Sequence, residues 1–176
     1  MPVRLILMRH AKSAWPAGVA DFDRPLAARG REAAPLMGGW LARKGLKPDL
    51  VWVSAAKRTR ETWALVAPAL SPVEPAFLQA IYAASEDGLM DLVRQADEAC
   101  GTLLLVGHNP GMQELAGGLA DPRRSDPDAL CRLSEKYPTA GIAILEADGR
   151  WSDLAPCSMR LSTFITPRAL GGVDED

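Results

Sequence analysis

Three short, uninterrupted apolar segments limit this chain to a small set of folds. They occupy residues 4–8 (R-L-I-L-M), 50–53 (L-V-W-V) and 102–106 (T-L-L-L-V), and each is followed by polar residues. Continuous apolar runs of this length are typical of strands buried on both faces of a parallel sheet. Segments with helical periodicity separate them, so the order of elements predicts an α/β fold with a mostly parallel central sheet.

The helices are predicted from apolar residues that recur every three or four positions. Such stripes occur in four segments, and Ser85 is a suitable N-cap for the third. The first stripe ends near Gly45, so Pro35 must lie in the first turn of that helix or kink it. The four stripes cover residues 36–41, 63–70, 89–96 and 112–119.

The C-terminal third of the chain predicts two departures from this pattern. Residues 142–146 and 151–154 flank Asp148-Gly149, a good hairpin turn signal, and predict an antiparallel strand at one side of the sheet. Residues 121–138 contain three prolines among mixed charges and are expected to form a long, lid-like loop. The 176 residues fit a single domain, residues 1–176, with a three-layer α/β/α architecture.

Composition and charge exclude several classes of function. The net charge of −2 lacks the basic surface of a nucleic-acid-binding protein. No apolar run approaches the roughly 20 residues of a membrane helix, and residues 1–10 do not have the features of a signal peptide, so we expect a cytoplasmic protein that does not bind membranes. Two histidines and three distant cysteines do not suit a metal site, and nucleotide-binding motifs are missing, so we expect neither metal nor cofactor.

The two histidines of the chain occupy informative positions. His10 follows the first apolar segment and is preceded by Arg9, and His108 follows the third. The second segment leads into residues 54–62, which carry further arginines. Open α/β sheets build their sites where parallel strands end. Two imidazoles and at least two guanidiniums should therefore meet at one edge of the sheet, where a bound anion would offset their repulsion.

A phosphoryl group suits this cluster. Arginine binds its oxygens in a bidentate way, and an imidazole serves as nucleophile or stabilises charge. After His108, Asn109 is a good N-cap and Pro110 a good first helical residue, so the N-terminus of the next helix should point toward the same anion. A strand-end histidine or an arginine-rich stretch taken singly is more often structural, but their convergence favours a site.

The motifs of the chain also resemble those of a known family. Three of them, in this order, resemble the motifs of the histidine phosphatase superfamily, also called the phosphoglycerate-mutase-like fold: R-H-A from Arg9, S-A-A-K-R-T-R-E-T from Ser54 and G-H-N-P-G from Gly107. Two more, in a chain this short, are similar to its small bacterial branch, the SixA-type phosphohistidine phosphatases: D-F-D-R-P-L from Asp21 and A-R-G-R from Ala28. Ala11 departs from the family, which usually has glycine there, and slightly crowds the backbone approach to a phosphate.

The resemblance implies roles for four residues. His10 would be the nucleophile that becomes transiently phosphorylated, and Arg9 and Arg58 would clamp the phosphoryl oxygens. His108 would donate a hydrogen bond or positive charge to the same group. Such positioning and charge stabilisation need no metal ion. Arg60 lies two residues after Arg58, roughly 200° around a helix, so it should face away from the site.

Lys12 and Ser13 follow the proposed nucleophile in the sequence. They are either secondary contacts to the substrate or ordinary exposed loop residues.

The position of a proton donor bears on the substrate. The resemblance implies that members cleaving esters of poor leaving groups carry a carboxylic acid just after the strand expected at residues 76–78. Here that stretch is L-Q-A-I-Y-A-A-S, and Glu86 and Asp87 come later, where they suit the first turn of a helix. An imidazole leaves as a neutral ring once it is protonated, so this gap favours a protein phosphohistidine. An acid from residues 121–135 could still reach the site.

The most favoured function is therefore a phosphatase acting on a phosphohistidine of a partner protein. Two alternatives stay open. One is a metal-independent phosphatase of small phosphorylated metabolites, and the other is a weakly catalytic module that binds phosphoproteins in the same pocket.

Overall fold

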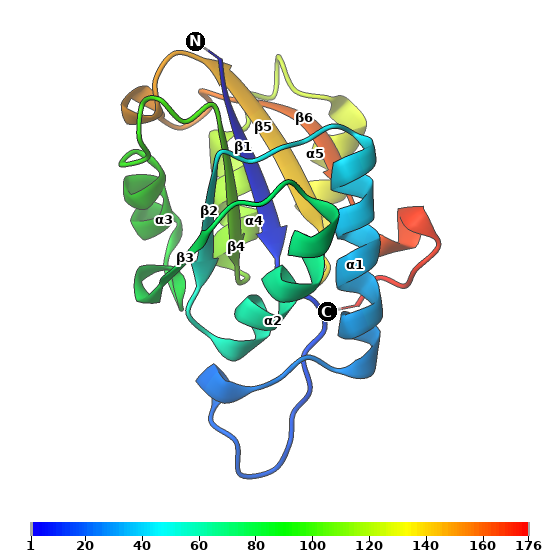
Figure 1. Ribbon diagram of the computed structural model, residues 1–176. Coiled ribbons are helices and arrows are strands. Elements are labelled where there is room, and N and C mark those ends of the chain that lie inside the picture. Colours follow the sequence, from blue (N-terminus) through cyan, green and yellow to red (C-terminus); the bar gives the residue numbers. More distant parts are fainter. Residues whose placement is uncertain (1, 176) are drawn as a thin grey trace.

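A six-stranded sheet forms the centre of the molecule (Figure 1). The computed structural model describes residues 2–175, so Met1 and Asp176 of the predicted domain lie outside the described part. The strand order is β3-β2-β4-β1-β5-β6, and the three apolar segments form the adjacent strands β2, β4 and β1. The strands are β1 (Pro2–Arg9), β2 (Leu50–Ser54), β3 (Pro75–Leu78), β4 (Thr102–Gly107), β5 (Ile142–Asp148) and β6 (Arg160–Ile165).

The sheet is mostly parallel, as the sequence predicts. β1 pairs in parallel with β4, and β2 pairs in parallel with both β3 and β4. β5 is antiparallel to its neighbours β1 and β6. The α/β class and the antiparallel strand toward one side are therefore confirmed.

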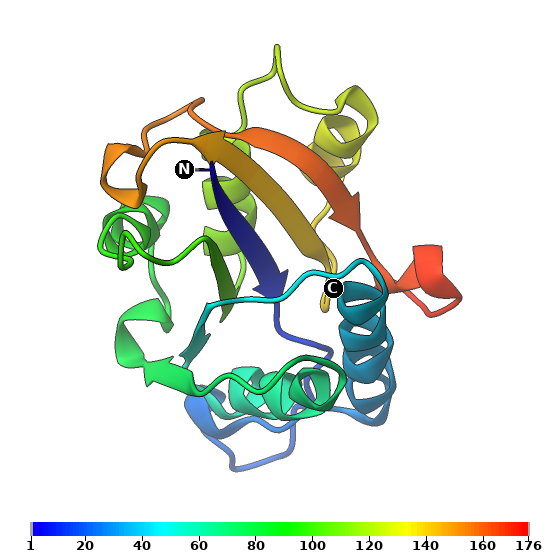
Figure 2. The ribbon, with the colours of Figure 1, turned by 45° about the horizontal axis from the view of Figure 1, so that its top comes forward.

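Helices cover both faces of the sheet and give three layers (Figure 2). Leu5 and Leu7 of β1 pack in one core with residues of α3, α4 and α5, whereas Ile6 and Met8 pack in a second core with residues of α1 and α2. Side chains on a strand alternate between faces, so burial on both sides explains the continuous apolar segments. The helices are α1 (Ala28–Arg43), α2 (Lys57–Val66), α3 (Glu86–Val93), α4 (Gly111–Leu119) and α5 (Pro127–Glu135).

The first helix is longer than its apolar stripe predicts. α1 begins at Ala28, so Pro35 lies well inside the helix; of the two predicted alternatives, a position in the first turn is wrong. The first turns carry the exposed Arg29, Arg31 and Glu32 and contribute little to the apolar face. An apolar stripe marks only the buried part of a helix, so it does not show where the exposed first turns begin.

The predicted hairpin is wrong in its second strand. Residues Trp151–Asp153 form a short 3-10 helix, and the strand that pairs with β5 is β6, further along the chain. The Trp151 side chain is fully buried, and its indole N–H donates to the carbonyl of Cys100 at 2.7 Å. This large side chain is anchored in the same core as Leu5 and Leu7, so the segment does not continue as a strand.

Residues 121–138 do not form the predicted lid-like loop, because α5 occupies their centre. The Asp126 side chain accepts a hydrogen bond from the N–H of Ala129 and caps the helix, and Pro127 lies in its first turn. A proline there removes no helical hydrogen bond, so it marks a helix start and not a loop. Among the residues that the structure describes, no helix combines the length and apolar character that crossing a membrane requires.

Candidate active site

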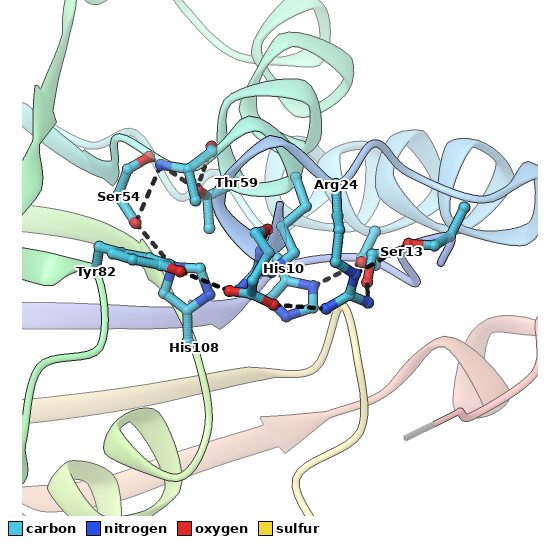
Figure 3. Close-up of polar contacts among 12 residues, drawn as sticks. His10, Ser13, Arg24, Ser54, Thr59, Tyr82 and His108 are labelled. Atoms are coloured by element: carbon cyan, nitrogen blue, oxygen red, sulfur yellow. Dashed lines mark hydrogen bonds and ion pairs between the residues drawn. The ribbon is translucent and has the colours of Figure 1, made fainter. Parts of the chain in front are cut away.

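The carboxyl ends of β1, β2 and β4 bring together the two histidines and Ser54 (Figure 3). The backbone N–H of His10 donates to the backbone carbonyl of Gly107 at 3.0 Å. This bond continues the pairing of β1 with β4 past the end of β1. The ring centroids of His10 and His108 are 5.4 Å apart. The predicted meeting of both imidazoles at one edge of the sheet is therefore confirmed.

The hydrogen bonding of His10 fixes which ring nitrogen is free. The side chain is only 7% exposed, and Nδ1 lies 2.8 Å from the carbonyl oxygen of Ala11. A carbonyl can only accept, so Nδ1 carries the proton and Nε2 keeps its lone pair. Burial, together with the neighbouring His108, Arg58 and Arg9, lowers the pKa of His10 well below its usual value of 6.5. The ring is thus neutral at pH 7 and presents an unprotonated nitrogen.

His108 is held by a hydroxyl at the end of the neighbouring strand. Its Nε2 lies 2.7 Å from Oγ of the fully buried Ser54. In the tautomer in which the Ser54 hydroxyl donates to Nε2, the ring proton lies on Nδ1, which is buried without a hydrogen-bond partner among the described residues. Burial and the positive charge of Arg58 lower the pKa of His108 to about 4. An unsatisfied buried N–H of this kind is costly unless a ligand atom accepts from it.

Both rings line a cavity of about 250 Å³, which we call the histidine pocket. Three guanidiniums line it as well, and this charge suits an anion with several oxygens. The Nε of Arg58 is buried without a partner among the described residues, as expected for a donor that awaits such a ligand. The lining residues are Arg9, His10, Lys12, Ser13, Trp15, Arg24, Arg58, His108 and Asn109.

The prediction that Arg58 faces the site and Arg60 faces away from it is confirmed. Arg58 is 6% exposed and lines the histidine pocket. The guanidinium of Arg60 instead lies 4.9 Å from the ring centroid of Phe77, outside this pocket. A separation of two positions on a helix turns the side chains to different faces.

Lys12 and Ser13 both line the histidine pocket. Ser13 is buried, and its Oγ accepts a hydrogen bond from Arg24 at 2.5 Å, so it is not an ordinary exposed residue. The ammonium of Lys12 lies 3.6 Å from a carboxylate oxygen of Glu175. The backbone here is packed closely against α1, since a Cβ on Gly30 would come within 2.1 Å of the Lys12 carbonyl oxygen.

Arg24 and Asp21 are two charged site residues that sequence reasoning missed. Arg24 is 6% exposed, and its guanidinium donates to Ser13, to the carbonyl of Ala14 and to the Asp21 carboxylate. Asp21 begins a short 3-10 helix, η1 (Asp21–Asp23). Both residues belong to the motif D-F-D-R-P-L, so their position in the family resemblance was the available signal.

The start of α4 differs by one position from the prediction. Pro110 occupies the N-cap and the helix begins at Gly111, so Asn109 and Pro110 precede it. The Asn109 side chain still stabilises the first turn of the helix, because its Oδ1 accepts a hydrogen bond from the backbone N–H of Gln113 at 3.3 Å. Asn109 also lines the histidine pocket.

The acids considered from the sequence lie elsewhere. Ser85 caps α3 as predicted, and Glu86 follows it with its carboxylate directed against Gly118 of α4. Within residues 121–135, Asp121 pairs with Arg124, Asp126 caps α5 and Asp128 pairs with Arg132. None of these acids lines the histidine pocket.

A second cavity of about 450 Å³ adjoins the histidine pocket, and we call it the side pocket. The two share Arg58, His108 and Asn109 in their linings. Its carboxylates come from Asp21 and from Glu114, in the first turn of α4. The side pocket thus offers open space beside His108.

The sequence of this chain is similar to a known protein family and to several known proteins. The model of the histidine phosphatase superfamily (branch 1) matches residues 5–81. An uncharacterized protein from Mycobacterium tuberculosis is 41% identical over 164 residues, which cover 92% of this chain and 100% of that protein. Phosphohistidine phosphatase SixA from Escherichia coli is 25% identical over 172 residues, which cover 93% of this chain and 100% of that protein.

Solved structures are similar over nearly the whole chain. A Nakamurella multipartitia protein provisionally assigned as phosphohistidine phosphatase SixA superposes with a TM-score of 0.82 at 31% identity, covering 95% of this chain and 97% of that one. The protein histidine phosphatase SixA complexed with tungstate superposes with a TM-score of 0.77 at 22% identity, covering 96% and 99%. At 22% identity, the similarity to the tungstate complex shows a shared fold alone.

Proposed function

This chain belongs to the histidine phosphatase superfamily, in its SixA-type branch, and we propose that it removes the phosphoryl group from a phosphorylated histidine of a partner protein. Phosphatase activity is the function that this family carries. The substrate, the covalent phosphohistidine intermediate and the roles of individual residues are our proposal. The partner is a cytoplasmic phosphoprotein.

The observation that carries the proposal is the state of His10. Its Nδ1–H is held by the Ala11 carbonyl, so Nε2 is an unprotonated nitrogen inside a pocket lined by guanidiniums. A neutral imidazole nitrogen beside positive charge is suited to attack an electron-poor phosphorus atom. Positioning and electrostatic stabilisation are the main requirements of phosphoryl transfer.

The reaction has two steps. In the first, the substrate imidazole carries a proton on its other ring nitrogen; Nε2 of His10 forms a bond to phosphorus while the bond between phosphorus and the substrate nitrogen breaks, and the substrate imidazole leaves as a neutral ring that keeps this proton. In the second, water attacks phosphorus, the bond to His10 breaks, and inorganic phosphate and the free ring result. Arg9 and Arg58 hold the phosphoryl oxygens in both steps, and Nδ1–H of His108 donates to one of them.

Leaving-group chemistry supports a phosphohistidine substrate. An imidazole with a pKa near 6.5 leaves as a neutral ring, whereas an alkoxide needs a strong proton donor. The acids Glu86 and Asp87 are not in the linings of either pocket. A phosphoramidate is the substrate that makes the smallest demand on such a donor.

A second candidate, a phosphatase of small metabolites, is favoured by one observation. Glu114 places a carboxylate on the side pocket, where a leaving alkoxide would lie. This function requires Glu114 to protonate the leaving group, so Glu114→Gln should then abolish hydrolysis of alkyl phosphates. Under the phosphohistidine proposal the same variant keeps its rate on phosphohistidine.

Rapid-quench kinetics with a labelled phosphohistidine peptide test the proposal. We expect multiple turnovers and an acid-labile label on the protein, with slow hydrolysis of the matched phosphoserine peptide. Binding at one equivalent without release of inorganic phosphate would indicate a phosphoprotein-binding module. Faster hydrolysis of alkyl phosphates than of phosphohistidine would shift the function to small metabolites.

A further inference from the structure

Asp21 places a carboxylate among the guanidiniums of the histidine pocket. Its Oδ1 accepts from Arg24 at 3.0 Å, and its Oδ2 accepts from Arg58 at 3.2 Å and from the Tyr82 hydroxyl at 2.6 Å. The Asp21 carboxylate thus bridges Tyr82 and Arg24, because it accepts a hydrogen bond from each (Figure 3). This carboxylate therefore accepts hydrogen bonds from the same guanidiniums that would bind an anion in the pocket.

The net positive charge around the site at least matches the negative charge of one dianion. Three guanidiniums and the Asp21 carboxylate, with both rings neutral, give a net charge of +2. Lys12 also lines the pocket, and it shares the carboxylate of Glu175 with Arg29, so it adds to the positive charge there. A phosphoryl group carries about −1.5 to −2 at neutral pH. Without Asp21 the pocket would be more positive than its ligand is negative.

Asp21 also fixes the direction of Arg58. Both terminal nitrogens of Arg58 donate to Asp21, one to the side chain and the other, at 2.7 Å, to the backbone carbonyl. The guanidinium plane is therefore set before any ligand arrives, with the buried Nε left over. Arginine held in advance loses less entropy when it binds an anion.

We propose that Asp21 is a positioning residue that acts as a built-in counter-anion: it orients Arg24 and Arg58 before a ligand binds and limits the affinity of the pocket for the product, inorganic phosphate. This inference rests on the proposed function, because it takes the phosphoryl group as the ligand. A weaker hold on phosphate lets the product leave after each turnover.

Calorimetric titration with inorganic phosphate tests this directly. Asp21→Asn removes the charge and keeps the shape, and the backbone carbonyl still holds Arg58, so we expect the Kd for phosphate to fall by about tenfold, the scale of one charge near a bound anion. Asp21→Glu restores the charge and should restore the wild-type Kd. Asp23→Asn is the matched control, because Asp23 is an exposed carboxylate on the same short helix, and it should leave the Kd unchanged.

Two further readouts separate a charge effect from a structural one. We expect Asp21→Asn to lower KM and kcat together, because substrate and product are both held more tightly. The charge of Asp21 raises the pKa of His108, so its loss should shift the NMR titration of that ring to lower pH. Asp21→Ser offers a second neutral variant if the first does not fold.

The outcomes are distinct for the two proposals. An unchanged or higher Kd in folded Asp21→Asn would overturn the counter-anion proposal while the wild type still bound phosphate. Wild-type protein that bound phosphate but did not turn over phosphohistidine would overturn the proposed function alone. Wild-type protein that neither bound phosphate nor turned over phosphohistidine would overturn both.

Discussion

His108 should make the stability of the fold fall between pH 7.5 and pH 5. The folded protein holds this ring with a pKa of about 4, because of burial and the charge of Arg58, whereas an unfolded histidine titrates near 6.5. Between these two values the unfolded chain binds a proton that the folded chain does not. The free energy of unfolding therefore decreases as the pH falls through 6.5, and this contribution stops decreasing below about pH 4.

The size of the effect follows from the two pKa values. At pH 5 the loss relative to pH 7.5 is about 2 kcal/mol for His108 alone. Urea unfolding of the wild type and of His108→Asn at both pH values measures it, since asparagine can still bond to Ser54 but does not titrate. The wild type should lose about 2 kcal/mol more than the variant, because the contributions of His10 and the carboxylates largely cancel in the difference. Phosphate should reduce the wild-type loss, because an anion favours the protonated ring.

Equal losses in the two proteins would refute this reasoning. They would mean that His108 titrates alike in the folded and unfolded states, and so that the pocket does not keep the ring neutral before the substrate binds.

Three other predictions follow from the site. Arg58→Lys should lower kcat/KM on phosphohistidine peptide by about 100-fold, because one ammonium cannot replace a fork that contacts two oxygens, while Arg60→Lys stays near wild type in the same assay. His10→Ala should give no acid-labile label in rapid-quench experiments, and a label on the variant would show that another residue is the nucleophile. Rates across aryl and alkyl phosphates should fall steeply as the pKa of the leaving group rises, and Glu86→Gln should not change that slope.

The central part of the fold could be predicted because local pattern and topology agree. A strand buried on both faces has to be apolar throughout, so residues 4–8, 50–53 and 102–106 were recognisable without any contact information. Parallel strands end at the same edge of a sheet, so the meeting of His10 and His108 followed from their places after two of these segments.

Arg24 and Asp21 could not be placed by the same reasoning. They lie in a connection without periodicity, and the path of such a segment depends on contacts across the fold. Arg24 is buried because the Trp15 ring covers its guanidinium, at 3.2 Å from the ring centroid, and because Ser13 accepts from it. The sequence shows these residues as neighbours in a polar stretch, which is equally typical of an exposed loop.

The errors in the C-terminal third have a different origin. Average tendencies of loops and strands do not describe Pro127 and Trp151, because each follows a more specific rule. A proline after a capping aspartate starts a helix, as Asp126 and Pro127 do in α5. A tryptophan whose indole finds a buried carbonyl is fixed by that bond and not by sheet pairing.

The state of Asp21 links the charge of the site to the choice of leaving group. The hydrogen bond from Tyr82 and the two guanidiniums lower the pKa of Asp21 to about 2, so it is a carboxylate at neutral pH and has no proton to give. Tyr82 donates to it, and that bond raises the pKa of the phenol above its usual value of 10. The acidic groups bonded to Arg58 thus supply charge and orientation, and not a proton. A substrate whose leaving nitrogen takes up its proton near neutral pH suits this arrangement, whereas an alkyl ester would need its proton from another group, such as Glu114 of the side pocket.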